Sequence, residues 1–179
     1  MTAPSVVLRS IETLAADVPW SDIDRLEQRM RAARRIYAYA VGRCGLVLRM
    51  FVMRLVHLGF ACHVVGEVTT PAIGPDDLLL IASGSGRTPT VAAVVEQARS
   101  TGADVLLLST HADSPLAARC TTLVQLPGRS KLDVEGDEQP PGSTFEQMLF
   151  CFLEEAVVVF MRHQGVSATE VMARHANVE

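Results

Sequence analysis

Hydroxyl side chains and glycines gather in one short segment, SGSGRT, at residues 83–88. Gly84 and Gly86 allow a tight turn and a close approach of the backbone to a ligand. Ser83, Ser85 and Thr88 offer hydrogen-bond donors, and an amphipathic run begins directly afterwards. The start of a helix adds free N–H groups and a positive dipole end. We therefore expect this segment to bind a phosphate group.

The class of phosphate ligand is narrowed by what the segment lacks. A P-loop needs a lysine after its glycines, and none follows here. The dinucleotide fingerprint needs a third glycine, whose place is taken by Pro89. A structural role is the alternative for Thr88, because threonine followed by proline is a favoured helix start. Taken together, the hydroxyl groups favour a small phosphate monoester over a nucleotide.

The elements that must position this loop alternate along the chain. Short apolar runs predict strands, and amphipathic runs between them predict helices. This alternation is typical of an α/β fold, a three-layer doubly wound sandwich around a parallel sheet of about five strands. In such folds ligands bind at the carboxyl ends of the strands. The predicted strands are 36–41, 61–65, 78–82, 103–109 and 121–126, and the predicted helices between them are 46–58 and 89–100.

Further helices are predicted at both ends of the chain, at 5–16, 20–35, 144–163 and 168–174. The helix at 144–163 is apolar nearly all round and needs cover on several sides, which indicates a homo-oligomer. We expect a single domain over residues 1–179. Its predicted parts are N-terminal helices at 1–35, an α/β core at 36–126, a mobile polar connection at 127–142 and C-terminal helices at 143–179.

The composition excludes several functional classes. Apolar residues make up 49% and charged residues 20%, which is a globular composition, and the net charge of −4 argues against a nucleic-acid partner. The four cysteines form no C-x-x-C pair, and no cluster has metal-ligand spacing, so we expect neither a metal nor another cofactor. With no bilayer-spanning stretch and no secretory signal, we expect a cytoplasmic protein without a membrane partner.

Placed after an apolar strand, SGSGRT resembles the phosphosugar signature of the sugar isomerase (SIS) domain family. Residues 41–60, 64–80, 142–150 and 174–179, which include GEVTTP, GSTFEQ and RHANVE, resemble the 6-phospho-3-hexuloisomerases of that family. The resemblance runs in order over nearly the whole chain. It implies a sugar-phosphate isomerase that moves the carbonyl of a 3-hexulose 6-phosphate from C3 to C2. The product would be fructose 6-phosphate, in formaldehyde fixation by the ribulose monophosphate route.

The implied reaction needs a base near C2 and C3, a group that shuttles hydroxyl protons, and a phosphate anchor. The resemblance points to Glu146 as the base, although Ser143 and Glu146 also fit a capping box. It points to His175 as the proton shuttle or ring opener, because histidine titrates near neutral pH. A solvent-exposed histidine is the alternative. We expect His175 to reach a site shared with a neighbouring subunit.

The resemblance implies further binding residues. Gly42 is one of them, and Arg43 is expected at the end of the first strand, where its charge can meet the sugar or the phosphate. Glu67 and Thr70 follow the second strand, and a loop ion pair or a cap is the alternative for Glu67. His57 is a further candidate, for which a contact with a helix C-terminus is the alternative.

Two positions depart from the family pattern. Cys44 stands where relatives usually have a serine that the resemblance associates with the phosphate, and Arg87 stands where many have glutamate. Two other functions stay open, a non-catalytic phosphosugar sensor like the SIS domains of transcription regulators, and another sugar-phosphate ketol isomerase. About 35 residues precede the first strand, and we expect these to be too few for the helix-turn-helix domain of such a regulator.

Overall fold

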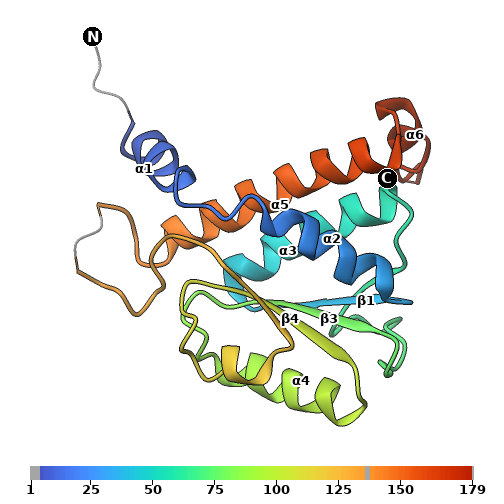
Figure 1. Ribbon diagram of the computed structural model, residues 1–179, viewed down its shortest axis with the longest axis horizontal. Helices are drawn as coiled ribbons and strands as arrows, with labels where there is room; N and C mark the ends of the chain where they lie inside the picture. The colour runs from blue at the N-terminus through green and yellow to red at the C-terminus, as the bar shows by residue number, and fades with distance from the viewer. Residues whose placement is uncertain (1–4, 136–137, 179) are drawn as a thin grey trace.

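Five parallel strands form one sheet in the computed structural model, which describes residues 5–135 and 138–178 (Figure 1). The order of the strands across the sheet is β2-β1-β3-β4-β5. The register pairs Ala38 with Leu80, and Leu80 with Leu106. Each strand lies within its predicted span, and the predicted fold class is confirmed. The strands are β1 (Ile36–Tyr39), β2 (Cys62–Val64), β3 (Leu78–Ala82), β4 (Asp104–Ser109) and β5 (Thr122–Gln125).

Helices cover both faces of the sheet, so that the sheet is the middle of three layers (Figure 1). Three of them, α2 (Asp22–Ala32), α3 (Gly42–His57) and α5 (Ser143–Gln164), lie on one face. On the other face lie α4 (Pro89–Ser100) and the 3-10 turn η1 (Ala117–Arg119). Strand side chains alternate between the faces, and all five residues of β3 are buried because both faces are covered.

Helix α3 begins earlier than the sequence predicts. The prediction placed its start at residue 46 and Arg43 at the end of a strand, but β1 ends at Tyr39 and the helix opens at Gly42. Gly42 has a φ of +60°, a left-handed conformation that glycine adopts without strain. Arg43 and Cys44 therefore lie in the first turn of a helix, beside the carboxyl end of β1.

Two shorter helices, α1 (Val6–Ala15) and α6 (Ala168–Ala173), lie near the ends of the chain. Helix α1 contacts α5 and has no fully buried residue. Residues 1–4, 136, 137 and 179 of the predicted domain and connection lie outside the described residues. In the part of the chain that is described, every helix is too short or too polar to cross a membrane.

Candidate active site

A cavity of about 310 Å³ opens at the carboxyl ends of β1 and β3. The chain runs from β1 to β2 on one side and from β3 to β4 on the other, so this crevice lies where the strand order reverses. Open α/β sheets bind ligands at such positions. The lining residues are Val41, Gly42, Arg43, Cys44, Ala82, Ser83, Gly84, Ser85, Thr88, Ser130, Lys131, Gly142, Phe145 and Glu146. The structure thus brings together seven of the predicted site residues: Gly42, Arg43, Ser83, Gly84, Ser85, Thr88 and Glu146.

The hydroxyl groups of the 83–88 loop lie beside the N-terminus of α4. Ser83 Oγ and Thr88 Oγ1 are 3.0 Å apart and hydrogen-bonded to each other. Thr88 occupies the N-cap position, followed by Pro89 as predicted, but its side chain does not cap the helix. Its hydroxyl therefore belongs to the cavity wall, where hydroxyl donors beside a helix N-terminus suit a phosphate dianion.

The end of β4 fixes the backbone of this loop. The Gly84 carbonyl accepts hydrogen bonds from Ser109 Oγ at 3.1 Å and from Thr110 Oγ1 at 2.9 Å. Gly86 has a φ of +60°, and a Cβ there would lie 2.1 Å from Ser114 Oγ. Since a side chain at Gly86 would meet both backbone strain and a clash, the tight turn of the loop depends on glycine.

The same loop packs directly on the start of α5. A Cβ at Gly84 would lie 2.9 Å from Phe145 Cδ1, closer than real Cβ atoms approach a neighbour. Phe145 is buried, and the next residue along the helix is Glu146. The phosphate loop and the candidate base are thus held in a fixed relation by one backbone-to-ring contact.

Glu146 pairs with Arg43 at the cavity wall. Arg43 Nε donates a hydrogen bond to Glu146 Oε2, and this contact raises the pKa of the arginine. The Glu146 side chain is only 16% exposed, whereas that of Arg43 is 69% exposed. The carboxylate therefore lies deep in the cavity, and the guanidinium lies at its mouth, where it can turn toward a ligand.

The capping-box interpretation of Glu146 is wrong. The N-cap of α5 is Gly142, with a φ of +88°, so Ser143 already lies inside the helix and makes no cap hydrogen bond. A capping box occurs instead at the start of α6, where Glu170 N donates to Ser167 Oγ at 3.3 Å and Ser167 N donates to Glu170 Oε2 at 2.8 Å. Glu146 faces Arg43 rather than its own helix end.

Of the two departures from the family pattern, one lines the cavity. Burial raises the pKa of the Cys44 thiol to about 11, and the charge of Glu146 adds to this. Cys44 is therefore a neutral thiol near pH 7 and a weak nucleophile. Arg87 is exposed and is not among the lining residues.

Sequence reasoning missed two polar residues of the cavity, Ser130 and Lys131. Both lie in the polar connection that was predicted only as a linker. The composition could have drawn attention to Lys131, because it is the only lysine among the 16 lysine and arginine residues of the sequence.

Three predicted binding residues, Glu67, Thr70 and His57, do not line this cavity. Glu67 Oε1 accepts a hydrogen bond from Arg49 Nη1 at 2.8 Å, and Thr70 Oγ1 donates to the Val64 carbonyl at 2.6 Å. The contact of Glu67 is the loop ion pair that sequence analysis gave as the alternative. Ligand-binding roles for Glu67 and Thr70 stay predictions.

Both candidate histidines lie at the other end of α3. His57 ends this helix, about 21 Å along its axis from Arg43. The rings of His57 and His175 are 5.1 Å apart between centroids, and Arg174 Nη1 donates to the His57 carbonyl at 2.9 Å. Burial, and then the charge of His175, lower the pKa of His57. Within one chain, His175 is therefore remote from Glu146.

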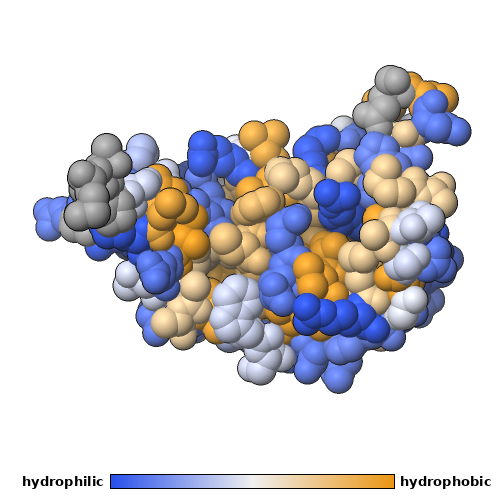
Figure 2. Space-filling view, turned by 90° about the horizontal axis from the view of Figure 1, so that it is seen from above, coloured by the Kyte–Doolittle hydropathy of each residue, from blue (hydrophilic) through white to orange (hydrophobic). Residues whose placement is uncertain are grey.

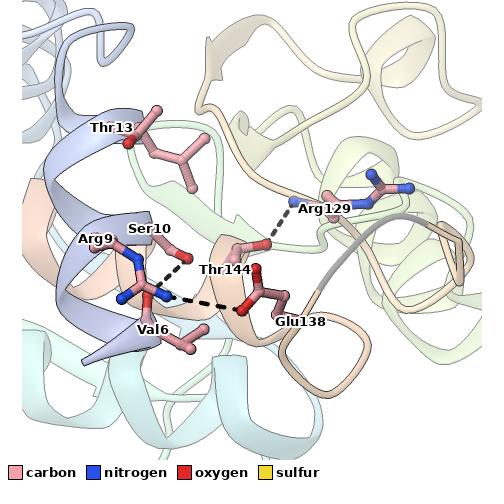
Figure 3. Close-up of a pocket in the computed structure, with 8 residues that line it drawn as sticks. Val6, Arg9, Ser10, Thr13, Arg129, Glu138 and Thr144 are labelled. Carbon is pink, nitrogen blue, oxygen red and sulfur yellow. Dashed lines mark hydrogen bonds and ion pairs between the residues drawn. The ribbon is translucent and has the colours of Figure 1, made fainter. Parts of the chain in front are cut away.

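A second cavity, of about 390 Å³, borders the start of α5 between α1 and the connection (Figure 3). Arg9 Nη2 and Glu138 Oε2 approach to 3.8 Å there, and Arg129 N donates to Thr144 Oγ1 at 3.0 Å. None of the described residues that line it was a predicted site residue. Its contacts attach α1 and the connection to the helical turn that carries Glu146.

The fold and the site together define the class. The chain belongs to the SIS domain family, whose model matches residues 29–153. A 3-hexulose-6-phosphate isomerase from Mycobacterium gastri is 40% identical over 177 residues, which covers 98% of this chain and 89% of that protein. Its counterpart from Bacillus subtilis is 31% identical over 97% of this chain and 95% of that protein.

A solved structure is also similar to this chain in both sequence and fold. The crystal structure of a hypothetical protein from Methanococcus jannaschii, reported to infer a function of 3-hexulose-6-phosphate isomerase, superposes with a TM-score of 0.80. It is 31% identical to this chain and covers 89% of it, and the match covers 86% of that structure. The similarity therefore extends over most of both chains.

Proposed function

We propose that this chain is a 3-hexulose-6-phosphate isomerase, which interconverts 3-hexulose 6-phosphate and fructose 6-phosphate in the ribulose monophosphate pathway. The cavity at the ends of β1 and β3 carries the proposal, because a hydroxyl-rich phosphate loop and the Arg43–Glu146 pair lie there together. Two relatives that bear this enzyme name, from Mycobacterium gastri and Bacillus subtilis, match nearly the whole chain.

The chemistry needs one base and a fixed phosphate. Glu146 takes the proton from C2, and the electrons move onto the C3 carbonyl oxygen to give a cis-enediolate. A proton passes from O2 to O3, and Glu146 returns its proton to C3, so that the carbonyl now lies at C2. The loop containing Ser83 and Thr88 holds the phosphate and keeps C2 at the base. Arg43 turns from Glu146 to a substrate oxygen when the sugar enters.

We further propose a homo-oligomer in which His175 serves the site of a neighbouring subunit. Support comes from the distance that separates His175 from Glu146 within one chain. An apolar row on α3, between 44% and 64% exposed, offers a surface for a second copy, and apolar side chains gather over the middle of the helical face (Figure 2). The row consists of Leu46, Met50, Met53 and Val56.

The four cysteines are free thiols in the structure. Free thiols are the usual state in a reducing compartment, and we place the enzyme in the cytoplasm on this ground.

A coupled assay tests the activity. Ribulose 5-phosphate and formaldehyde are supplied with a hexulose-phosphate synthase, and fructose 6-phosphate is measured with and without the protein. Product above the control without the protein is expected. Binding of the sugar phosphate with no product would instead favour a phosphosugar sensor and would refute the isomerase.

Complementation tests the shared site. Glu146→Gln and His175→Asn chains, each with impaired turnover, are co-expressed and purified as mixed oligomers. If the base and the shuttle come from different subunits, part of the turnover returns, because some sites combine two intact groups. Mixed oligomers as inactive as the parent variants would place both groups in one chain.

A further inference from the structure

Lys131 lines the cavity from the connection between β5 and α5. It is the only lysine in the sequence, and the other 15 basic residues counted with it are arginines. Across residues 5–135 and 138–178, Lys131 forms no ion pair or side-chain hydrogen bond. Arg43, the other cation on the cavity wall, is already paired with Glu146. Lys131 thus supplies the unpaired positive charge of the site.

The turn that carries Lys131 is held by its own hydrogen bonds. Ser130 is buried, and both its N–H and its hydroxyl donate to Asp133 Oδ2 at 2.8 Å. Leu132 N donates to Ser130 Oγ at 3.2 Å. The hydrogen bonds from Ser130, and then the nearby His111, hold the pKa of Asp133 below its usual value. The carboxylate therefore stays charged near neutral pH and fixes the backbone on both sides of Lys131.

The turn is also attached to α5. Arg129 N, two residues before Lys131, donates to Thr144 Oγ1 at 3.0 Å (Figure 3). At Gly142, the position of an added Cβ would have Lys131 Cβ and Glu146 Oε1 each 3.7 Å away. The lysine stem and the carboxylate thus flank the same point. Lys131 therefore lies beside the candidate base on the cavity wall.

We propose that Lys131 is a further catalytic residue, whose ammonium group donates a hydrogen bond to the substrate oxygen that becomes negative. This inference rests on the proposed isomerase function. When Glu146 removes the C2 proton, the C3 carbonyl oxygen gains the charge, and the ammonium stabilises it without being consumed. A positioned cation acts on the charge that develops in the transition state, so it raises kcat more than it lowers KM. Ser130 and Asp133 are positioning residues for it.

Substitution separates this role from phosphate binding. Lys131→Met should lower kcat by about 100-fold to 1,000-fold, as loss of one charge-stabilising donor does. Competitive inhibition by inorganic phosphate should stay within about two-fold, because the loop at 83–88 binds the phosphate. Leu132→Ala is the matched control, since Leu132 is an exposed neighbour on the same turn and should keep wild-type kinetics. The melting temperature reports whether each variant is folded.

Labelling gives a readout that does not depend on turnover. An amine-acylating reagent can modify only one side-chain amine in this chain, and the α-amino group serves as an internal reference. Fructose 6-phosphate should slow the acylation of Lys131, followed by mass spectrometry, whereas inorganic phosphate should not.

Each outcome decides the inference. A kcat of Lys131→Met within about three-fold of wild type overturns it, as does acylation that fructose 6-phosphate leaves unchanged. A raised KM and weakened phosphate inhibition at unchanged kcat would make Lys131 a phosphate ligand, which also overturns the catalytic role. Wild-type protein without any turnover would refute the isomerase itself, a result distinct from all of these.

Discussion

Replacing Gly84 with alanine should disturb catalysis through Phe145, which touches no substrate in our proposal. The new Cβ would lie 2.9 Å from Phe145 Cδ1 and 3.3 Å from Cγ, so the ring has to retreat by roughly 0.5–1 Å to reach an ordinary carbon contact. The ring is only 1% exposed and cannot move alone. Overpacking of this kind costs about 1–3 kcal/mol, and Glu146 moves with the ring.

A displacement of this size has a measurable effect on turnover. Misplacing a catalytic group by about 1 Å costs up to about 100-fold in rate, so kcat/KM should fall by roughly 10-fold to 100-fold in the coupled assay. The melting temperature should fall by a few degrees, as follows from a loss of this size in a chain of this length. Gly74→Ala is the control, because a Cβ there meets its nearest neighbour, an oxygen of Asp77, at 3.8 Å.

A second substitution tests the cause. Phe145→Leu removes the ring that the Gly84→Ala side chain meets, so the double variant should recover part of the lost activity. The reasoning is refuted if Gly84→Ala behaves like wild type, or if the double variant is no more active than Gly84→Ala alone.

Three further predictions concern the site and the histidine pair. Glu146→Gln should lose about 100-fold to 10,000-fold in kcat with little change in phosphate inhibition, and near-wild-type turnover would contradict its role as base. Cys44→Ser should strengthen inhibition by inorganic phosphate up to about 10-fold, since a hydroxyl hydrogen bond contributes about 0.5–1.5 kcal/mol; weaker inhibition would show that the hydroxyl does not reach the ligand. Burial and His175 lower the pKa of His57, so the folded state disfavours its protonation. The contribution of His57 to stability is present above its unfolded pKa of about 6.5 and is lost as pH falls. The protection of the backbone amides at residues 168–178, measured as exchange relative to the unfolded chain at the same pH, should therefore fall between about pH 7.5 and pH 5.5 in wild type, and less so in His57→Phe.

The parts of the fold that the sequence predicts well carry local signals. Strand β3 and helix α4 begin and end at the predicted residues, because Leu78–Ala82 is an unbroken apolar run and Pro89 marks a helix start. The start of α3 is predicted four residues late, because residues 42–45 show no apolar periodicity. The left-handed Gly42 that opens this helix is a backbone feature, which a hydrophobic pattern does not express.

The candidate site was predictable only in part, because its residues meet through long-range contacts. The hydroxyl groups of the 83–88 loop can be recognised from the composition of that segment. Glu146 can be recognised only from the resemblance to the family. The prediction of a capping box at Ser143 and Glu146 is wrong because Gly142 occupies the N-cap position, so that Ser143 lies inside the helix. Lys131 was missed because its place depends on the fold of the connection, which a hydrogen bond from Arg129 to Thr144 attaches to α5.

The single lysine also determines which side chain of this protein can form an imine with an aldehyde. Primary amines add to aldehydes to form carbinolamines and imines, and a guanidinium that stays protonated is a far weaker nucleophile. With 15 arginines and one lysine, the chain presents one side-chain amine to such reagents, and that amine lines the cavity. Imine formation on a side chain is therefore confined to Lys131, and under the proposed function a sugar phosphate bound in the cavity should slow it.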